Sequence, residues 1–408
     1  MRRGIGTILT LILLLAPASC RQDVRAPASE KTPTIRVRLF TNLSDAKVAA
    51  AAQPPRVVAG GVERRLNFPA SGDVPLTLTA SGWQVGSLDL GGANAELIIE
   101  PAVVGSVRVN GQFHRGRYRF VPVGENKFDV VNDVDLDSYL MGVLAKEIPE
   151  RWGEEAFKAQ AIAARTYALY EAKTSGGKYW DVWADTRSQV YGGLGAETTK
   201  SRMAADATSG VVLAYGPTGR ERIFKAYFSS CCGGTGQSAR DALGDADIPP
   251  LAEKYVGPLC NISERFNWSK PVVISKDELT RRIRAWGKRR DRPEKDMAKL
   301  ARIDIAESNR FSRPIRFQLT DERGARYSLT SEETRWACNA DANGGPTLLS
   351  GFFKPIVEKD RIQFADGHGF GHGVGLCQWC TAVQAERGMA HEDILRHAYP
   401  GAVLVRAY

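Results

Sequence analysis

The segment at residues 154–169, EEAFKAQAIAARTYAL, is almost wholly apolar but carries a few strongly polar side chains. Lys158 and Arg165 are seven residues apart, so in a helix they share one stripe, two turns apart. Lysine and arginine are seldom buried without a partner or a cavity. In one interpretation the stripe lines a cleft for a polar ligand. In the other it makes structural salt bridges, for which the candidate partners are Glu154, Glu155 and Asp185.

A carboxylate stands at the end of the preceding helical segment. Asp137 can cap a helix over SYLMGVLAKE, and Pro149 forces that helix to end near Glu147. In the cleft interpretation, this helix, which Pro149 stops abruptly, delivers the Glu147 carboxylate into the same cleft.

The segments around these helices predict an α+β protein. Alternating strand patterns and the turn signal Asn110-Gly111 indicate an antiparallel β-rich N-terminal region at 35–131. A mixed α/β domain with a substrate cleft is expected at 132–408. Within it, residues 277–302 form a strongly charged helical stretch to which we assign no site, and 303–350 are expected to be a β-rich insertion.

The first 20 residues have the pattern of an export signal. Arg2 and Arg3 precede an apolar run at 5–16 that is too short to span a bilayer, and small residues lead to Cys20. The pattern resembles the bacterial lipoprotein signal, in which Cys20 is the site of lipid attachment, although Pro17 stands where an aliphatic residue is usual. An ordinary secretory signal is the alternative. Residues 21–34 are polar and contain prolines, as expected of a tether.

The composition agrees with an exported globular protein. The chain has 408 residues, 43% of them hydrophobic, and a formal charge of +9. For an exported, lipid-anchored protein, the natural partners of this charge are the anionic polymers and the membrane surface of the cell envelope. We expect no nucleic-acid partner.

Three motifs carry a resemblance to a known family. They are YLMGVLAKEIPERWGEEAFKAQAIAARTYAL at 139–169, DVWADTRSQVYGG at 181–193, and GHGFGHGVGLCQW at 367–379 followed by ILRHAYPG. In this order they resemble the SpoIID/LytB family of bacterial envelope proteins, over roughly residues 35–408. That family includes lytic transglycosylases, which cleave the glycan strands of peptidoglycan, and proteins described as amidase enhancers.

The resemblance implies that Glu147 is the catalytic acid. A protonated glutamate in a partly apolar pocket has a raised pKa and can give its proton to the glycosidic oxygen. In a lytic transglycosylase the 6-hydroxyl of the sugar is the nucleophile, so no second carboxylate is needed to position a water, and deprotonated Glu147 then acts as the base.

The resemblance also implies a set of residues that line the glycan cleft. Their donors and acceptors suit sugar hydroxyls, acetamido carbonyls and the lactyl carboxylate of muramic acid. For Tyr191 a core position is the alternative. The glycines that alternate between 367 and 375 would present a bare backbone face to a polymer, with a flexible loop as the alternative. The expected substrate-binding residues are Lys158, Gln160, Arg165, Asp185, Gln189, Tyr191, Ser229, Ser230, His372 and Gln378.

The cysteines depart from the family pattern. Cys377 and Cys380 stand where the family commonly has serine and glycine, and Cys231-Cys232 lie in a serine-rich turn that is expected nearby. Four converging thiols could bind structural zinc. Because disulfides persist outside the cytoplasm, we expect disulfides in preference to zinc, and the chemistry requires no cofactor.

Two functions follow from the sequence. The first is an envelope lytic transglycosylase that acts on peptidoglycan glycan strands. The second is a non-catalytic peptidoglycan-binding protein that enhances an N-acetylmuramoyl-L-alanine amidase, which would then be a partner. The acid at the end of a broken helix favours the enzyme. A Ser-His-Asp hydrolase is not favoured, because the sequence has no GxSxG elbow.

Overall fold

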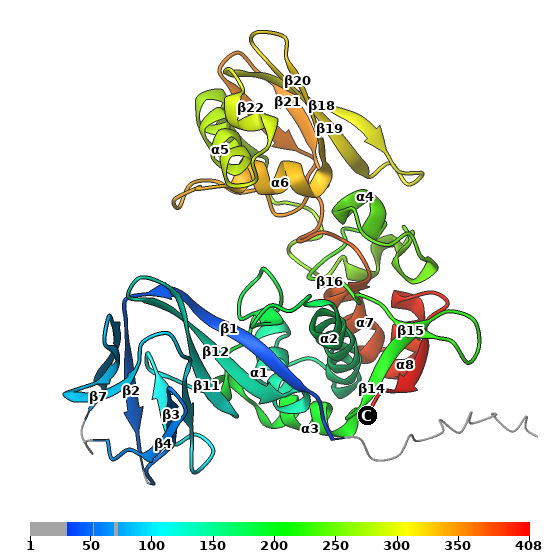
Figure 1. Ribbon diagram of the computed structural model, residues 1–408. Helices are drawn as coiled ribbons and strands as arrows, with labels where there is room; N and C mark the ends of the chain where they lie inside the picture. Colours follow the sequence, from blue (N-terminus) through cyan, green and yellow to red (C-terminus); the bar gives the residue numbers. More distant parts are fainter. Residues whose placement is uncertain (1–30, 52, 69–71) are drawn as a thin grey trace, which may run out of the picture.

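The computed structural model describes residues 31–51, 53–68 and 72–408. The predicted signal segment with Cys20 lies outside the described residues, as does the tether before residue 31. The described chain forms eight α-helices and six sheets of two to seven strands, which confirms the α+β prediction. In Figure 1 a β-rich unit lies at the lower left, a helical unit at the centre and right, and a third unit above them.

Two packed sheets form the N-terminal unit. The first has the spatial order β13 (Val182–Trp183), β1 (Thr34–Leu43), β12 (Lys127–Asp135), β11 (Arg117–Gly124), β8 (Leu97–Glu100), β3 (Arg56–Ala59), β4 (Val62–Arg65). The second has the order β10 (Gln112–Phe113), β9 (Val107–Val109), β2 (Asp45–Ala50), β5 (Val74–Thr79), β6 (Gly82–Val85), β7 (Leu88–Gly92).

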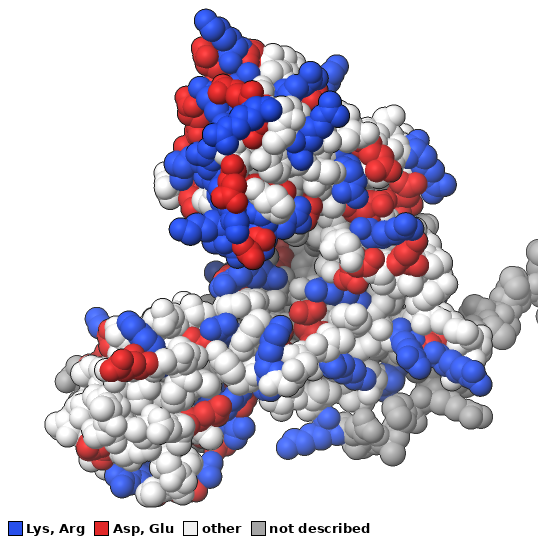
Figure 2. Space-filling view, turned by 45° about the horizontal axis from the view of Figure 1, so that its top comes forward, with Lys and Arg blue, Asp and Glu red and all other residues white. Residues whose placement is uncertain are grey.

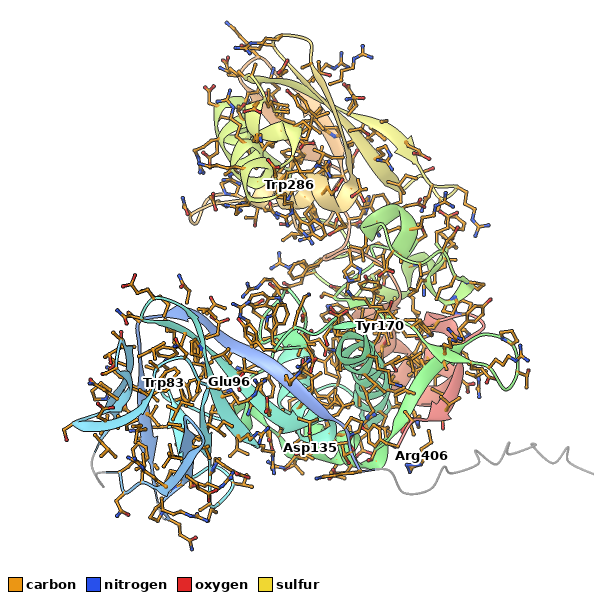
Figure 3. All side chains as sticks on the ribbon, in the orientation of Figure 1. Trp83, Glu96, Asp135, Tyr170, Trp286 and Arg406 are labelled. Carbon is orange, nitrogen blue, oxygen red and sulfur yellow. The ribbon has the colours of Figure 1, made fainter. Side chains whose placement is uncertain are left out.

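The strands β1 and β12 join this unit to the helices. At one end of the pair, Phe128 packs in the N-terminal core against Trp83, with ring centroids 5.2 Å apart; Trp83 is labelled in Figure 3. At the other end, Ile35 and Val134 pack in the core of the helical unit. The short strand β13 pairs parallel to β1, with Val182 opposite Val37. One continuous sheet therefore reaches from the N-terminal core to the segment that follows the second helix.

The helical unit is built around one buried helix. Residues 156–157, 159 and 161–164 of α2 are fully or almost fully buried, because α1, α3, α7, α8 and β14 all contact it. This explains why that helix is apolar on nearly every side. The helices are α1 (Leu136–Glu147), α2 (Glu154–Thr174), α3 (Thr199–Ala207), α4 (Ala239–Leu243), α7 (Gln378–Glu386) and α8 (His391–Ala398). The strands are β14 (Val211–Tyr215), β15 (Arg222–Ile223), β16 (Phe228–Ser229), β23 (Leu376–Cys377) and β24 (Val403–Arg406), and the 3-10 turns are η1 (Leu194–Ala196), η2 (Pro249–Leu251) and η3 (Gly257–Cys260).

The N-cap of the first helix lies two residues earlier than predicted. Asp135 is the N-cap, and its carboxylate accepts a hydrogen bond of 2.9 Å from the Ser138 N–H. Asp137, the predicted cap, instead pairs with Arg165. The helix ends at Glu147 as predicted, because Pro149 restricts Ile148 to extended backbone (φ −133°, ψ 145°).

The third unit has its own core. Trp286 packs there with Phe317, which stacks on Phe353 at 4.8 Å. Its elements run from residue 272 to residue 365, a wider span than the predicted 303–350. The elements are β17 (Val272–Ser275), α5 (Lys276–Arg289), η4 (Pro293–Asp296), β18 (Leu300–Ser308), β19 (Pro314–Asp321), β20 (Arg326–Thr330), α6 (Ser331–Asn339), β21 (Lys354–Val357) and β22 (Arg361–Ala365).

The helix predicted over 277–302 is shorter than expected. It ends at Arg289, after which Asp291 takes a left-handed conformation (φ 49°) and Pro293 begins a 3-10 turn. Lys and Arg side chains cover much of the visible face of this unit, and the surface is hollowed between it and the lower body (Figure 2). Within the described residues, no helix is both long and apolar enough to span a membrane.

Candidate active site

The Glu147 carboxylate lies where three distant segments meet. It is half-buried at the end of α1. One oxygen accepts a hydrogen bond of 2.8 Å from the Val190 N–H, and the other accepts one of 3.3 Å from the Gln378 side-chain amide, in the first turn of α7. The three motifs of the sequence therefore contribute to a single carboxylate. Gln378 lies beside Glu147, as its predicted role requires.

Burial raises the pKa of the Glu147 carboxyl, while the hydrogen bonds from Val190 and Gln378 lower it; burial is the larger effect. The side-chain amide of Gln378 carries both a donor and an acceptor. It can therefore donate to the carboxylate or, after rotation, accept from the carboxylic acid. A carboxyl that is partly shielded from water and contacted by a group suited to both of its protonation states is equipped to transfer a proton.

A close approach between α1 and residues 191–193 positions the Val190 N–H. The Gly142 carbonyl accepts a hydrogen bond of 3.2 Å from the Gly192 N–H. A Cβ at Gly142 would lie 2.8 Å from the Tyr191 ring and 3.0 Å from the Gly193 carbonyl oxygen. Glycine is therefore required at this position for the segment to dock. The sequence motif contained Gly142 but did not indicate this packing role.

Gln189 and Tyr191 support the site from behind. Both are buried, Gln189 at 1% exposure. The Gln189 side chain accepts a hydrogen bond from the Tyr139 hydroxyl (3.1 Å) and donates one to the Ala164 carbonyl (3.3 Å). The Tyr191 hydroxyl donates to Asn132. Tyr191 thus takes the core position that was its alternative, and the prediction that these two side chains contact substrate is wrong in this structure.

Arg165 is a structural cation. Its side chain is fully buried and bonded to the Asp137 carboxylate (2.9 Å). The other groups that accept hydrogen bonds from its guanidinium, at 3.0–3.2 Å, are the Tyr408 hydroxyl, the Thr208 hydroxyl and the carbonyls of Ala205 and Val211. All three nitrogens of the guanidinium therefore donate hydrogen bonds within the protein. The cleft role predicted for Arg165 is therefore wrong, and the salt-bridge interpretation applies, with Asp137 as the partner.

Lys158 and Gln160 also lie away from the carboxylate. Lys158 pairs with Glu155 at 2.7 Å and lines a separate surface pocket with Glu150, Glu154 and Lys200. Gln160 is 1% exposed, and neither polar atom of its side chain has a hydrogen-bond partner among the described residues. Its burial contradicts the predicted contact with a glycan. The polar stripe of α2 therefore does not floor a cleft beside Glu147.

Asp185 is exposed and ion-paired to Arg187 at 2.6 Å, and this hydrogen-bonded partner lowers the pKa of its carboxyl. The Arg187 guanidinium lies 3.4 Å from the ring centroid of Trp183. The rings of Trp183, at the end of β13, and Trp180, just before that strand, lie 4.7 Å apart. The sequence pattern did not single out this aromatic pair, although two tryptophans shortly before Val190 are a signal that could have indicated it.

The glycine-rich segment is packed against the turn that contains Ser229 and Ser230. Gly371, Gly373 and Gly375 all have positive φ. A Cβ at Gly375 would lie 2.1 Å from the Tyr227 carbonyl oxygen. The alternating glycines are therefore explained by a close approach of two backbone segments, which contradicts both a bare polymer-binding face and a free loop.

Ser229, Ser230 and His372 hold this packing together. The Ser229 hydroxyl accepts a hydrogen bond from the Gly373 N–H (3.1 Å), and the Ser230 carbonyl accepts one from the Trp379 N–H (3.1 Å). The His372 Nδ1 accepts one from the Val374 N–H (3.0 Å). These contacts fix the start of α7, and with it Gln378. Among the described residues, none of the three is hydrogen-bonded to Glu147.

The predicted cysteines do converge, at the start of α7. Cys232, Cys377 and Cys380 come together as expected. The fourth thiol of the group is Cys260, at the end of η3, while Cys231 lies beside it. The sequence reasoning did not include Cys260, because an isolated cysteine 28 residues after Cys232 has no motif of its own.

Comparisons with known proteins agree with this arrangement. The family model for the stage II sporulation protein SpoIID matches residues 124–215, which contain α1, α2 and Val190. An uncharacterized protein of Brachyspira hyodysenteriae is 28% identical over 73% of this chain and 73% of its own length.

Two relatives from Bacillus subtilis carry functional names. Its stage II sporulation protein D is 23% identical over 70% of this chain and 79% of its own length. Its amidase enhancer is 25% identical over 65% of this chain, and the match spans 40% of that longer protein. The domain match shows that residues 124–215 carry the domain of the SpoIID/LytB family, and over roughly two thirds of its length the chain is similar to a stage II sporulation protein D and an amidase enhancer.

Proposed function

We propose that this protein is an exported lytic transglycosylase of the bacterial envelope that cleaves peptidoglycan glycan strands, with Glu147 as general acid and then general base. The similarity to an amidase enhancer and to a stage II sporulation protein D supports a cell-wall-related role. The observation that carries the proposal is the half-buried Glu147 carboxyl, whose pKa is raised by burial at the junction of three motifs.

The proposed reaction is balanced with a single carboxyl group. Glu147 donates its proton to the glycosidic oxygen as the bond from that oxygen to the muramic acid anomeric carbon breaks. The 6-hydroxyl of the same muramic acid attacks the anomeric carbon and forms a 1,6-anhydro ring. Glu147, now ionised, takes the proton of that hydroxyl and returns to its starting state. No water is consumed, so no second carboxylate is required.

The groups around Glu147 support both halves of this cycle. Burial favours the protonated acid before cleavage, and the Val190 N–H and the Gln378 amide stabilise the carboxylate afterwards. Because neither Arg165 nor Lys158 is bonded to Glu147 in the described structure, no fixed cation holds the carboxyl ionised. This absence favours an acid over a permanently charged carboxylate.

The second candidate function is a non-catalytic enhancer of an amidase, with that amidase as the partner. The observation that favours it is the similarity to the Bacillus subtilis amidase enhancer. In that case Glu147 would not be required for activity. Export with a lipid anchor at Cys20 is part of either proposal.

The test uses purified protein incubated with glycan strands, with and without stem peptides. Mass spectrometry of the products should show 1,6-anhydromuramic ends with the wild type and none with Glu147→Gln. Glu154→Gln, a change of the same type at an exposed carboxyl seven residues further on, should leave the products unchanged. Reducing ends would indicate hydrolysis instead, and no cleavage by the wild type would favour the enhancer.

A further inference from the structure

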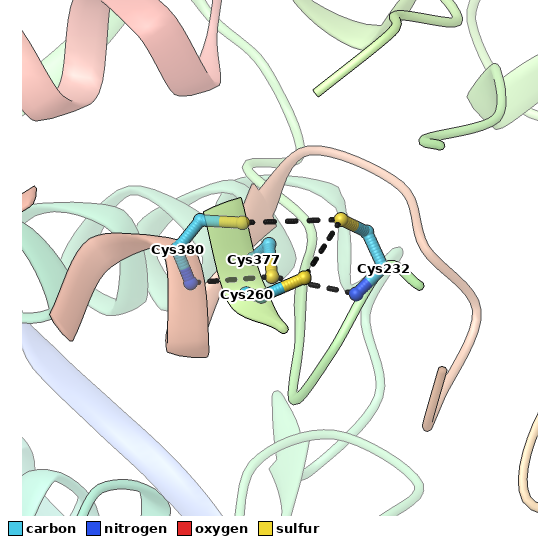
Figure 4. A group of neighbouring side chains, drawn as sticks. All are labelled: Cys232, Cys260, Cys377 and Cys380. Atoms are coloured by element: carbon cyan, nitrogen blue, oxygen red, sulfur yellow. Dashed lines mark hydrogen bonds between the residues drawn. The ribbon is translucent and has the colours of Figure 1, made fainter. Parts of the chain in front are cut away.

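Four buried cysteine thiols converge at the start of α7. The sulfurs of Cys232, Cys260, Cys377 and Cys380 are all within 4.8 Å of one another. Cys232 Sγ lies 3.6 Å from Cys260 Sγ and 3.9 Å from Cys380 Sγ (Figure 4). In a tetrahedral site with metal–sulfur bonds of about 2.3 Å, neighbouring sulfurs are about 3.8 Å apart. The two separations match that geometry.

The thiols come from three segments that are far apart in the sequence. Cys232 lies in the turn after β16, Cys260 ends η3, and Cys377 and Cys380 begin α7. The two-residue spacing of the last pair places both thiols on the first turn of a helix, a spacing typical of zinc ligands. Each segment is held by its own backbone contacts, so the four thiols are brought together by the fold itself.

Backbone N–H donors contact one of the thiols, and two cationic side chains lie near the group. The Cys377 sulfur accepts hydrogen bonds from the N–H groups of Cys232 (3.3 Å) and Cys380 (3.4 Å), as drawn in Figure 4. The buried Arg313 guanidinium donates to the Cys232 carbonyl at 2.9 Å. The half-buried ammonium of Lys254 lines the same pocket as three of the thiols. Four thiolates and one divalent cation carry a net charge of about −2, which these donors offset.

The arrangement differs from what a pair of disulfides would produce. Cys232 is nearly equidistant from two other sulfurs, so no exclusive partner is marked out for it. Cys231, whose sulfur lies 3.6 Å from that of Cys260, is a further neighbour. A sulfur that is similarly close to several other sulfurs is better explained by one metal ion bound to all of them than by a disulfide to one of them.

We propose that Cys232, Cys260, Cys377 and Cys380 form a closed tetrathiolate site for one structural Zn²⁺ ion. This proposal replaces the sequence-based expectation of disulfides. Binding displaces the thiol protons to solvent and changes no oxidation state. With four protein ligands no position is open for a substrate, so the role is structural. Gln378 lies between two of the ligands, so the metal would fix the residue that contacts Glu147.

The experiment measures the metal and the thiols of the wild-type protein together. Protein purified without reductant or chelator is assayed for zinc by mass spectrometry. A second sample is unfolded in guanidinium with a chelator and an alkylating agent, without reductant. We expect about one zinc ion per chain and alkylation of all four cysteines, because a chelator frees metal-bound thiols but not disulfides. Disulfide-linked, unalkylated peptides, or a chain without zinc, would overturn the proposal.

A pair of variants assigns the ligands. Cys260→Ser should lower the zinc content at least tenfold. Cys338→Ser, at a buried thiol in the core of the third unit, should leave it unchanged. Equal zinc content in the two variants would overturn the ligand set. If Cys260→Ser does not fold, the wild-type measurement still decides the matter. Zinc content is independent of glycan cleavage, so failure of this proposal and failure of the proposed function are distinguishable.

Discussion

The assignment of Arg165 as a structural cation predicts a large loss of stability in Arg165→Met. The substitution keeps an unbranched side chain of similar length, so packing is mostly retained, but it leaves the Asp137 carboxylate without its cation. Ser209 and Tyr408 still donate hydrogen bonds to Asp137, at 2.6 and 2.8 Å. Removing one partner of a buried ion pair costs about 3–5 kcal/mol.

This loss converts into a measurable shift in melting temperature. A domain of roughly 150–250 residues loses about 2–4 °C in Tm for each kcal/mol. We therefore expect Arg165→Met to lower the Tm by roughly 6–20 °C, as measured by far-UV circular dichroism during thermal unfolding. The matched control is Lys158→Met on the same stripe of α2. Its partner Glu155 is partly exposed, so the loss should be at most about 1 kcal/mol.

The double variant Asp137→Asn/Arg165→Met separates the ion pair from packing. Because it removes both charges, it should be more stable than Arg165→Met alone. The reasoning would be refuted if Arg165→Met had an unchanged Tm and a weakened affinity for glycan strands. That result would mean that Arg165 faces the substrate.

Three further predictions concern the surroundings of Glu147. Burial gives the folded protein a Glu147 pKa above that of the unfolded chain, so the wild type loses stability as the pH rises from the unfolded value through the raised one. Glu147→Gln lacks this loss, so the Tm of the variant minus the Tm of the wild type should increase across this pH range. A difference independent of pH would contradict the assignment. Gln378→Ala removes a hydrogen-bond donor that lowers the Glu147 pKa, so the descending limb of the pH–activity profile should move to higher pH. The kcat should fall about tenfold. A descending limb at unchanged pH would count against the contact. Gly142→Ala should disturb the docking of Tyr191 and lower the Tm by roughly 2–12 °C for an overpacking cost of about 1–3 kcal/mol, with unchanged thermal unfolding as the contrary result.

The sequence was sufficient for the features that depend on local patterns. Pro149 correctly predicted where α1 ends, and the apolar run of α2 correctly predicted a buried helix. A pattern of residue types is enough for these two features, because helix breaking by proline and an apolar surface on all sides of a helix can be recognised within a few turns of sequence. The family resemblance, and no local pattern, correctly placed Gln378 near Glu147, although 231 positions separate them.

The errors arose where a residue is satisfied by distant parts of the chain. The partners of Arg165 include Val211 and Tyr408, so its burial could not be anticipated from α2 alone. The glycines near residue 371 are required by contact with the turn at 227–233, which no local pattern reveals. The charged stretch after Arg289 was predicted as helix because its charge run outweighed the breaking effect of Pro293. Long-range packing decided the positions of Arg165 and of these glycines, whereas the end of the helix at Arg289 is a local effect of Pro293.

The central claim is that the Glu147 carboxyl transfers the proton that breaks the glycan. The most direct measurement is the rate at which 1,6-anhydromuramic ends form from purified glycan strands, for the wild type, Glu147→Gln and Glu154→Gln. General acid catalysis contributes about 10²–10⁴ in rate, so Glu147→Gln should be slower by that factor while Glu154→Gln matches the wild type. Equal rates for the wild type and Glu147→Gln would contradict the account.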